Sequence, residues 1–154
     1  MARKARSLAL MSASLLVMAG GAVLTAPQAS AAVSCSGTIT YDHTFNYNGS
    51  PAVELTIYYN STNGGTNSAC LYHRGAYYGV AKHTEVQIHR CSQRNPGSVC
   101  SYTASSPVDS GNFAYQAGPV GVTGTASYCV TAEGSMAINS TTTLFVSSPV
   151  TVGC

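Results

Sequence analysis

The stretch Ala81-Lys-His-Thr-Glu-Val-Gln-Ile-His-Arg-Cys91 decides the fold predicted for this chain. Its central residues alternate strictly in polarity: Thr84, Val86 and Ile88 are apolar or β-branched, and His83, Glu85, Gln87 and His89 are polar. A two-residue period of this length predicts a β-strand with one buried and one solvated face. The strand ends at Cys91, and a turn sequence, Arg-Asn-Pro-Gly at 94–97, separates it from Cys100. We therefore expect a disulfide-closed hairpin at the middle of an all-β domain.

The beginning of the chain, residues 1–31, is predicted to be a cleaved signal peptide. A basic segment, 1–6, precedes an apolar run at 8–24, and Ala29-Ser30-Ala31 forms a small-x-small cleavage site. The alternative is an uncleaved membrane anchor, which usually needs about 20 apolar residues. Cleavage leaves residues 32–154 as the mature chain, which we expect to be secreted, without membrane association, and folded as a single domain.

The charge of the mature chain argues against a nucleic-acid partner. Three basic residues, Arg3, Lys4 and Arg6, leave with the signal peptide. The seven Lys and Arg residues of the whole chain then fall to four, which against five acidic residues give a net charge of −1. No basic cluster is left that could follow a phosphate backbone.

All of the cysteines belong to the mature chain: Cys35, Cys70, Cys91, Cys100, Cys129 and Cys154. An even number in a secreted protein predicts three disulfides, for which fifteen pairings are possible. Short separation favours Cys91–Cys100, and Cys35–Cys70 and Cys129–Cys154 complete a nearest-neighbour pattern. A zinc site is disfavoured because the chain has no C-x-x-C pair, so we expect no metal and no cofactor.

Alternating residues predict several more short strands, at 39–47, 53–59, 69–74, 99–104, 113–117, 120–123, 127–131, 142–146 and 150–152. Turn residues separate them, as at 48–51 and at 109–112. This regular spacing predicts an antiparallel β-sandwich or open barrel stapled by disulfides. Three glycines, Gly118, Gly121 and Gly124, suggest a bulged strand edge.

One segment, Asp-Ser-Gly-Asn-Phe-Ala-Tyr-Gln-Ala-Gly-Pro-Val at 109–120, followed by a glycine turn and Cys129, resembles a known family. It is similar to the C-terminal half of small secreted actinobacterial proteins of the spore-associated protein A type. Further similarities are an Ala-rich signal peptide, a cysteine soon after it, and the segment 59–70. The loop 91–100 and the terminal Cys154 depart from that pattern. The resemblance implies a protein of the spore or cell envelope with no established catalytic activity.

The residues themselves offer no convincing catalytic or metal site. On one strand, His83 and His89 would lie about 20 Å apart, too far to share one metal ion, so we interpret their face as solvated. The five acidic residues are scattered, and nothing in their spacing brings two together for glycoside hydrolysis. Ser110 lies between turn residues and outside any triad pattern, so we predict that the protein is not an enzyme.

Binding is the better-supported prediction, with Tyr77, Tyr78 and Tyr115 as candidate contacts. Outward tyrosine rings suit a glycan or protein partner, although tyrosine is also an ordinary strand residue. We predict a non-enzymatic protein of the cell or spore surface, which acts by binding or as an envelope component. Its partner would be a cell-wall or spore-coat component or another protein. The alternative is a secreted inhibitor or toxin-like effector that presents residues 92–99 to a target enzyme, with Arg94 as the anchor.

Overall fold

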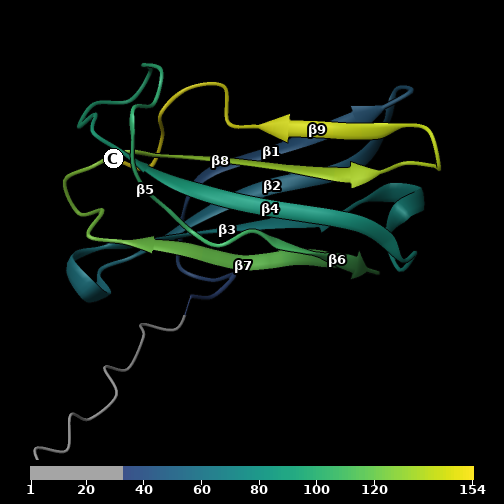
Figure 1. Cartoon of the computed structure of the whole chain (residues 1–154), viewed down its shortest axis with the longest axis horizontal. Coiled ribbons are helices and arrows are strands. Elements are labelled where there is room, and N and C mark those ends of the chain that lie inside the picture. The colour runs from purple at the N-terminus through teal and green to yellow at the C-terminus, as the bar shows by residue number, and fades with distance from the viewer. Residues whose placement is uncertain (1–32) are drawn as a thin grey trace, which may run out of the picture.

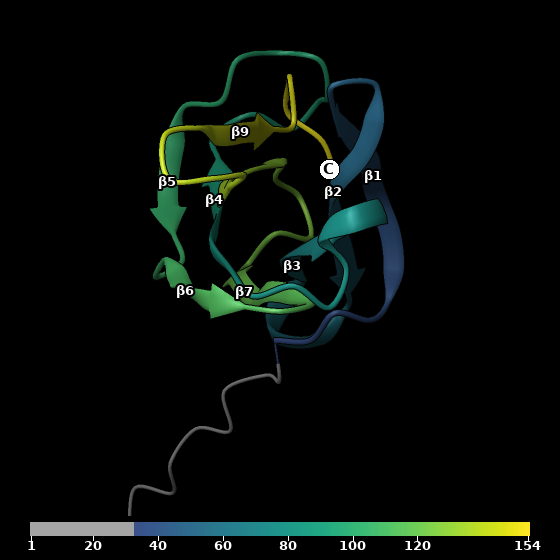
Figure 2. The ribbon, with the colours of Figure 1, turned by 90° about the vertical axis from the view of Figure 1, so that its right-hand side faces the viewer.

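The computed structural model describes residues 33–154, so the predicted signal peptide lies outside the described residues. Strands account for most of this part, and they form two antiparallel sheets that face one another (Figures 1 and 2). The first sheet has the order β1-β2-β3-β7, with β1 (Thr38–Tyr47), β2 (Ser50–Asn60), β3 (Thr66–His73) and β7 (Gln116–Thr123). The predicted all-β class is therefore confirmed, and of the two predicted architectures the structure has the sandwich.

The second sheet is built around the strand that the sequence placed at the centre. Its order is β5-β4-β8-β9, with β5 (Tyr102–Ser105), β4 (Lys82–Cys91), β8 (Val130–Ala137) and β9 (Thr143–Ser147). A further strand, β6 (Asp109–Phe113), pairs with β4 on the same side as β5. The end-on view of Figure 2 shows β6 beside β7, where the two sheets approach each other.

The core lies between the two sheets and follows the alternation of the strands. From the second sheet, Val86 and Ile88 of β4 point inward and are fully buried, while Leu55 and Leu71 come from the first sheet. Gly134 of β8 leaves no room for a side chain, because a Cβ there would collide with backbone of β4 in the same sheet and press on Leu71 of the opposite sheet. The apolar residues of the alternating pattern are thus the ones that the two sheets bury between them.

The three disulfides follow the nearest-neighbour pattern: Cys35–Cys70, Cys91–Cys100 and Cys129–Cys154. They fix the start of the described chain to β3, close the β4–β5 connection, and fix the chain's last residue beside β8. Three disulfides fit a protein of an oxidising, extracellular compartment. Nor does the described part of the chain contain any helix with the length and hydropathy that a membrane span requires.

Several predicted strand limits are wrong, most clearly between residues 109 and 137. Residues 109–112, expected as a turn, belong to strand β6, and the turn falls at Ala114 and Tyr115 instead. Strand β6 pairs only with β4, so it is an edge strand and does not need an apolar alternation. Its polar residues therefore resemble those of a turn in the sequence. Strand β8 runs from 130 to 137 rather than 127–131, and residues 150–152 make only an isolated bridge, Val130 to Val152. The predicted bulge is present, because the β3–β7 register shifts around the cis Gly118-Pro119 bond.

Candidate functional site

The outer face of the second sheet carries a groove, which we call the outer groove. Strands β4 and β8 form its floor, while β9 and the β5–β6 connection supply its apolar rims. Its volume is about 390 Å³, and its lining consists of Glu85, Val86, Gln87, Val108, Glu133, Gly134, Phe145, Val146 and Ser147. The ring of Phe145 is 76% exposed at one rim, and Val108 is exposed at the other.

Two carboxylates, those of Glu85 and Glu133, line the outer groove. The β4–β8 register pairs Glu85 with Ser135 and Gln87 with Glu133, so the two glutamates are diagonal neighbours. Diagonal residues on one face of an antiparallel pair lie roughly 7–8 Å apart. The Ser135 hydroxyl donates to Glu85 Oε1 at 3.0 Å, which orients that carboxylate. The strand pairing thus places on one face two acids that lie 48 positions apart in the sequence, which their spacing in the sequence does not indicate.

His89 lies at one end of this face, and the prediction that it is solvated is wrong. Only 4% of the residue is exposed, because the Tyr102 ring stacks on the imidazole with a centroid distance of 4.1 Å. His89 Nδ1 lies 2.7 Å from Ser105 Oγ, and Nε2 lies 3.4 Å from Glu133 Oε1. Burial raises the pKa of Tyr102, and the nearby Glu133 carboxylate adds to this effect. His83, at the other end of the strand, remains exposed as predicted.

The Ser105–His89–Glu133 array has the residue types of a hydrolase triad, but its surroundings favour a supporting role. Acyl transfer needs backbone amides aimed at an oxyanion. Two amides next to this array are already engaged, since Ser106 N donates to Ile88 O and Ile88 N donates to Ser106 Oγ. We interpret the array as the support that holds Tyr102 flat against the sheet. Among residues 33–154, no three His, Cys, Asp or Glu side chains gather in a way that could hold a metal ion.

Two of the three candidate tyrosines lie together, at the opposite end of β4. The rings of Tyr78 and Tyr115 are exposed and meet edge to face, with a centroid distance of 5.1 Å. We call these two residues the tyrosine pair. Tyr77 instead packs against the hydrophobic core, with the ammonium group of Lys82 5.9 Å from its ring centroid. Adjacent tyrosines thus differ in their surroundings: Tyr77 is partly buried against the core, whereas Tyr78 is exposed beside Tyr115.

Arg94 lies far from the tyrosine pair, in the loop 92–99 that follows the other end of β4 (Figure 1). Its guanidinium carbon lies 4.7 Å from the centre of the Tyr128 ring, and Nη2 donates to the Tyr128 hydroxyl at 3.1 Å. The structure therefore separates the four candidate binding residues into three sites. Only one of those sites brings two of them together.

Sequence reasoning missed Phe145 and Val99, the two most exposed large apolar residues of the described chain. Phe145 stands between Leu144 and Val146, and three consecutive apolar residues do not reveal which of them points outward. Val99 was assigned to a strand, whereas β5 begins only at Tyr102.

Comparison of the chain with protein families, with curated proteins and with solved structures finds no match. The class of protein that the structure itself defines is a disulfide-stapled, all-β sandwich of extracellular type. Its function has to be inferred from its own surfaces.

Proposed function

We propose that this is a secreted, non-enzymatic protein that acts at the cell or spore surface by binding a wall or coat polymer in the outer groove. The observation that carries the proposal is the groove's combination of polar and apolar surface. Glu85, Gln87, Glu133 and Ser147 offer hydrogen-bonding groups along a floor that is rimmed by Phe145 and Val108. Sites of roughly 300–1,000 Å³ with a few placed polar groups beside apolar walls are typical of ligand binding.

A glycan is the ligand chemistry that this surface suits best. Sugar hydroxyls are donors and acceptors, and carboxylate and amide side chains complement both. The apolar face of a sugar ring packs on an aromatic side chain, which the exposed ring of Phe145 provides. The resemblance to envelope-associated proteins supports the same location, and three disulfides suit a protein outside the cell.

The test begins with the location of the native protein in a culture separated into medium, mycelial wall and spores. We expect the protein to remain on washed walls or spores. Purified walls should also retain the recombinant protein, and Phe145→Ala or Glu133→Gln should weaken this retention by about tenfold, since aromatic and polar contacts of a buried ligand contribute about 1–3 kcal/mol. Ile39→Ala removes an exposed apolar side chain from β1, in the other sheet, and serves as the matched control. A protein found only in the medium, with no affinity for walls, would refute the surface role.

The second candidate function, inhibition of a target enzyme by residues 92–99, is favoured by one further observation. This loop is closed by the Cys91–Cys100 disulfide and is bonded to the C-terminal segment at several points. Inhibitory loops need such rigidity, because a loop that is ordered beforehand loses less entropy on binding.

A further inference from the structure

We propose that Val99, and not Arg94, is the anchor by which the loop 92–99 occupies the active site of a serine protease with a small aliphatic S1 pocket. The inference rests on the second candidate function, inhibition by this loop, and names both its contact residue and its class of target. Three features carry it: the engagement of Arg94, the exposure of Val99, and the bracing on either side of Val99.

Arg94 is not free to act as an anchor. Its guanidinium is placed over the Tyr128 ring and hydrogen-bonded to the Tyr128 hydroxyl, and Arg90 approaches the same ring at 5.6 Å. Entry into a protease pocket would break the stacking and the hydrogen bond together. The same contacts give Arg94 a structural role, since they tie the loop to the segment before β8.

The Val99 side chain is exposed to solvent. It is 86% exposed, more than any other large apolar residue of the described chain. Within residues 33–154, neither its backbone N–H nor its backbone C=O takes part in a hydrogen bond. Proteins that bind extended peptides pair with such free backbone groups and place the side chain in a pocket. Val99 therefore offers every group that a protease uses to hold the residue before the scissile bond.

The residues before Val99 are fixed by one threonine of the C-terminal segment. Thr151 N donates to Ser98 O at 2.9 Å, and Gly97 N donates to Thr151 O at 3.1 Å. The Thr151 side chain adds two more bonds, because its hydroxyl oxygen accepts from Ser98 N at 3.2 Å and its hydroxyl contacts Asn95 O at 3.3 Å. Thr151 itself is fully buried, so this support is firm.

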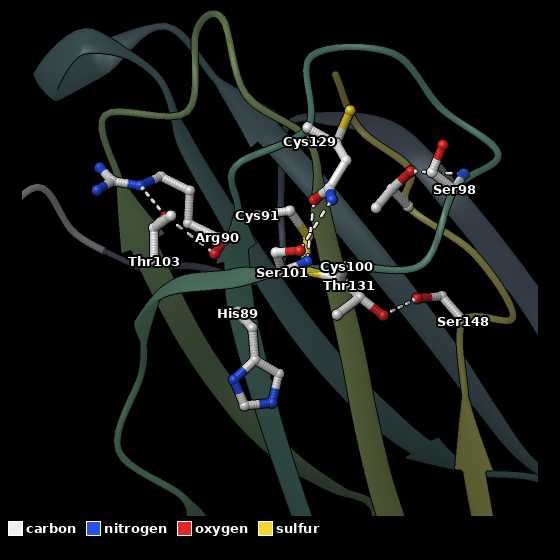
Figure 3. Close-up of a disulfide and its surroundings, with 12 residues drawn as sticks. His89, Arg90, Cys91, Ser98, Cys100, Ser101, Thr103, Cys129, Thr131 and Ser148 are labelled. Atoms are coloured by element: carbon white, nitrogen blue, oxygen red, sulfur yellow. Dashed lines mark hydrogen bonds between the residues drawn. A yellow bond between two sulfur atoms is a disulfide. The ribbon is translucent and has the colours of Figure 1, made fainter.

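The residues after Val99 are fixed by the disulfide and by a second set of bonds. Cys100 is joined to Cys91, the last residue of β4, whose backbone N–H donates to Cys129 O at 2.8 Å (Figure 3). Ser92 N donates to Ser101 O, and Ser101 N donates to the side chain of Gln93. Val99 is thus an unpaired residue between two fixed neighbours. Hydrolysis of the Val99–Cys100 peptide bond, which would add water to give a carboxylate and an amine, would leave the two ends joined through Cys91.

The side chain selects the class of protease. Serine proteases read the residue before the scissile bond in the S1 pocket, which is small in elastase and carries an aspartate in trypsin. Valine is short, apolar and β-branched, so it fills a small aliphatic pocket and leaves a deep, charged one unsatisfied. An elastase-type enzyme is therefore the expected target, whereas Arg94 as anchor would require a trypsin-type enzyme.

The experiment measures inhibition constants of the mature, disulfide-bonded chain against an elastase-type and a trypsin-type protease. We expect inhibition of the elastase-type enzyme, a loss of about 100-fold or more for Val99→Asp, and no change for Arg94→Ala. Val99→Arg should transfer inhibition to the trypsin-type enzyme. Val80→Asp is the matched control, since Val80 is also exposed but precedes the other end of β4. Unfolding curves confirm that each variant is folded.

The outcomes separate the two levels of the proposal. Inhibition of the trypsin-type enzyme that is lost in Arg94→Ala would refute Val99 as the anchor while leaving the inhibitory function standing. Absence of inhibition of both enzymes by the unaltered chain would refute inhibition of serine proteases and the anchor with it. Rapid cleavage after Val99 without inhibition would show that the loop is a substrate, which also overturns the proposal.

Discussion

The two ends of strand β4 hold their exposed side chains by different means. Before β4, the turn at residues 75–80 contains the short helix η2 (Gly75–Tyr77) and packs Tyr77 against the core, and Gly79 N donates to Ala114 O at 2.8 Å. After β4, the loop 92–99 contributes no residue to the core and relies on a disulfide and on Thr151. Figure 1 shows the two connections at opposite ends of the sandwich.

The difference shows how a small all-β protein can present side chains at both ends. Where a turn packs against the core, the partly buried Tyr77 fixes the position of its neighbour Tyr78, whose ring meets that of Tyr115. Where a loop does not reach the core, its backbone entropy has to be limited by covalent and hydrogen bonds. The first arrangement displays two rings in contact, and the second displays one isolated side chain, Val99.

The largest effects are expected from removing disulfides, and the bridge that supports the loop should matter less than one that closes a longer segment. Replacing both Cys91 and Cys100 by alanine should lower the free energy of unfolding by about 2.5 kcal/mol, because the reduced chain gains loop entropy when unfolded. Removal of Cys35–Cys70, which closes a longer segment of 35 residues, should lower it by about 4 kcal/mol. Urea unfolding measures both. Equal effects for the two pairs would contradict the dependence on loop length.

At the other end, the core-packed tyrosine should matter and its exposed neighbour should not. Tyr77→Ala removes a ring that packs on the core, which should lower the free energy of unfolding by about 2 kcal/mol. Tyr78→Ala should change it by less than about 0.5 kcal/mol, as for most surface substitutions. Thermal unfolding of the two variants tests the comparison directly. A larger loss for Tyr78→Ala would mean that the tyrosine pair, rather than the core, holds this turn.

The same end should respond to pH through His73. This residue is fully buried beside the turn, its Nε2 lies 2.8 Å from Thr84 Oγ1, and its Nδ1 has no hydrogen-bond partner. Burial lowers the pKa of His73, and the positive charge of Lys82 acts in the same direction. The unfolded chain therefore binds a proton at higher pH than the folded one. Stability should be complete above about pH 6.5 and fall as the pH decreases from there, by about 1.4 kcal/mol per unit of pKa difference.

The pH response is measured as the free energy of unfolding between pH 7.5 and 5.5, with His73→Gln as the control. The variant should be less stable at neutral pH but should show a flatter dependence in this range. Glu54 contributes only at lower pH, because its hydrogen bonds with Arg74 hold its pKa below the usual value. An unchanged slope in His73→Gln would assign the response to another group.

A small effect is also expected for Arg94→Ala, at the loop end. Stacking on Tyr128 at an exposed position should contribute about 0.5–1 kcal/mol to the free energy of unfolding. Tyr128→Leu should remove this stabilisation together with the contact of Arg90 on the same ring, and the double variant should lose little more than Tyr128→Leu alone. Additive losses in this double-mutant cycle would show that the two side chains do not interact.

Much of the fold could be predicted because strand alternation is a local property. The period of residues 83–89 correctly identified the central strand and its buried residues Thr84, Val86 and Ile88. The hairpin of β1 and β2 was predicted from the alternation on either side of a turn at 48–51, of which the last two residues belong to β2, and the shortest cysteine separations matched all three disulfides. Strand β6 was missed, because an edge strand of polar residues has no apolar period to detect.

The sequence by itself determined the class: an all-β chain whose six cysteines pair as disulfides, as in proteins of oxidising compartments. Only the tertiary structure decided where its chemistry gathers. Cross-strand register joined Glu85 to Glu133, and Tyr102 covered His89, although each pair is separated in the sequence by 13 or more residues. The Arg94 side chain is engaged by the Tyr128 ring, whereas the Val99 side chain in the same loop is exposed. The physical reason is that alternation depends on neighbours along the chain, whereas sites depend on which distant strands pair and on what covers them.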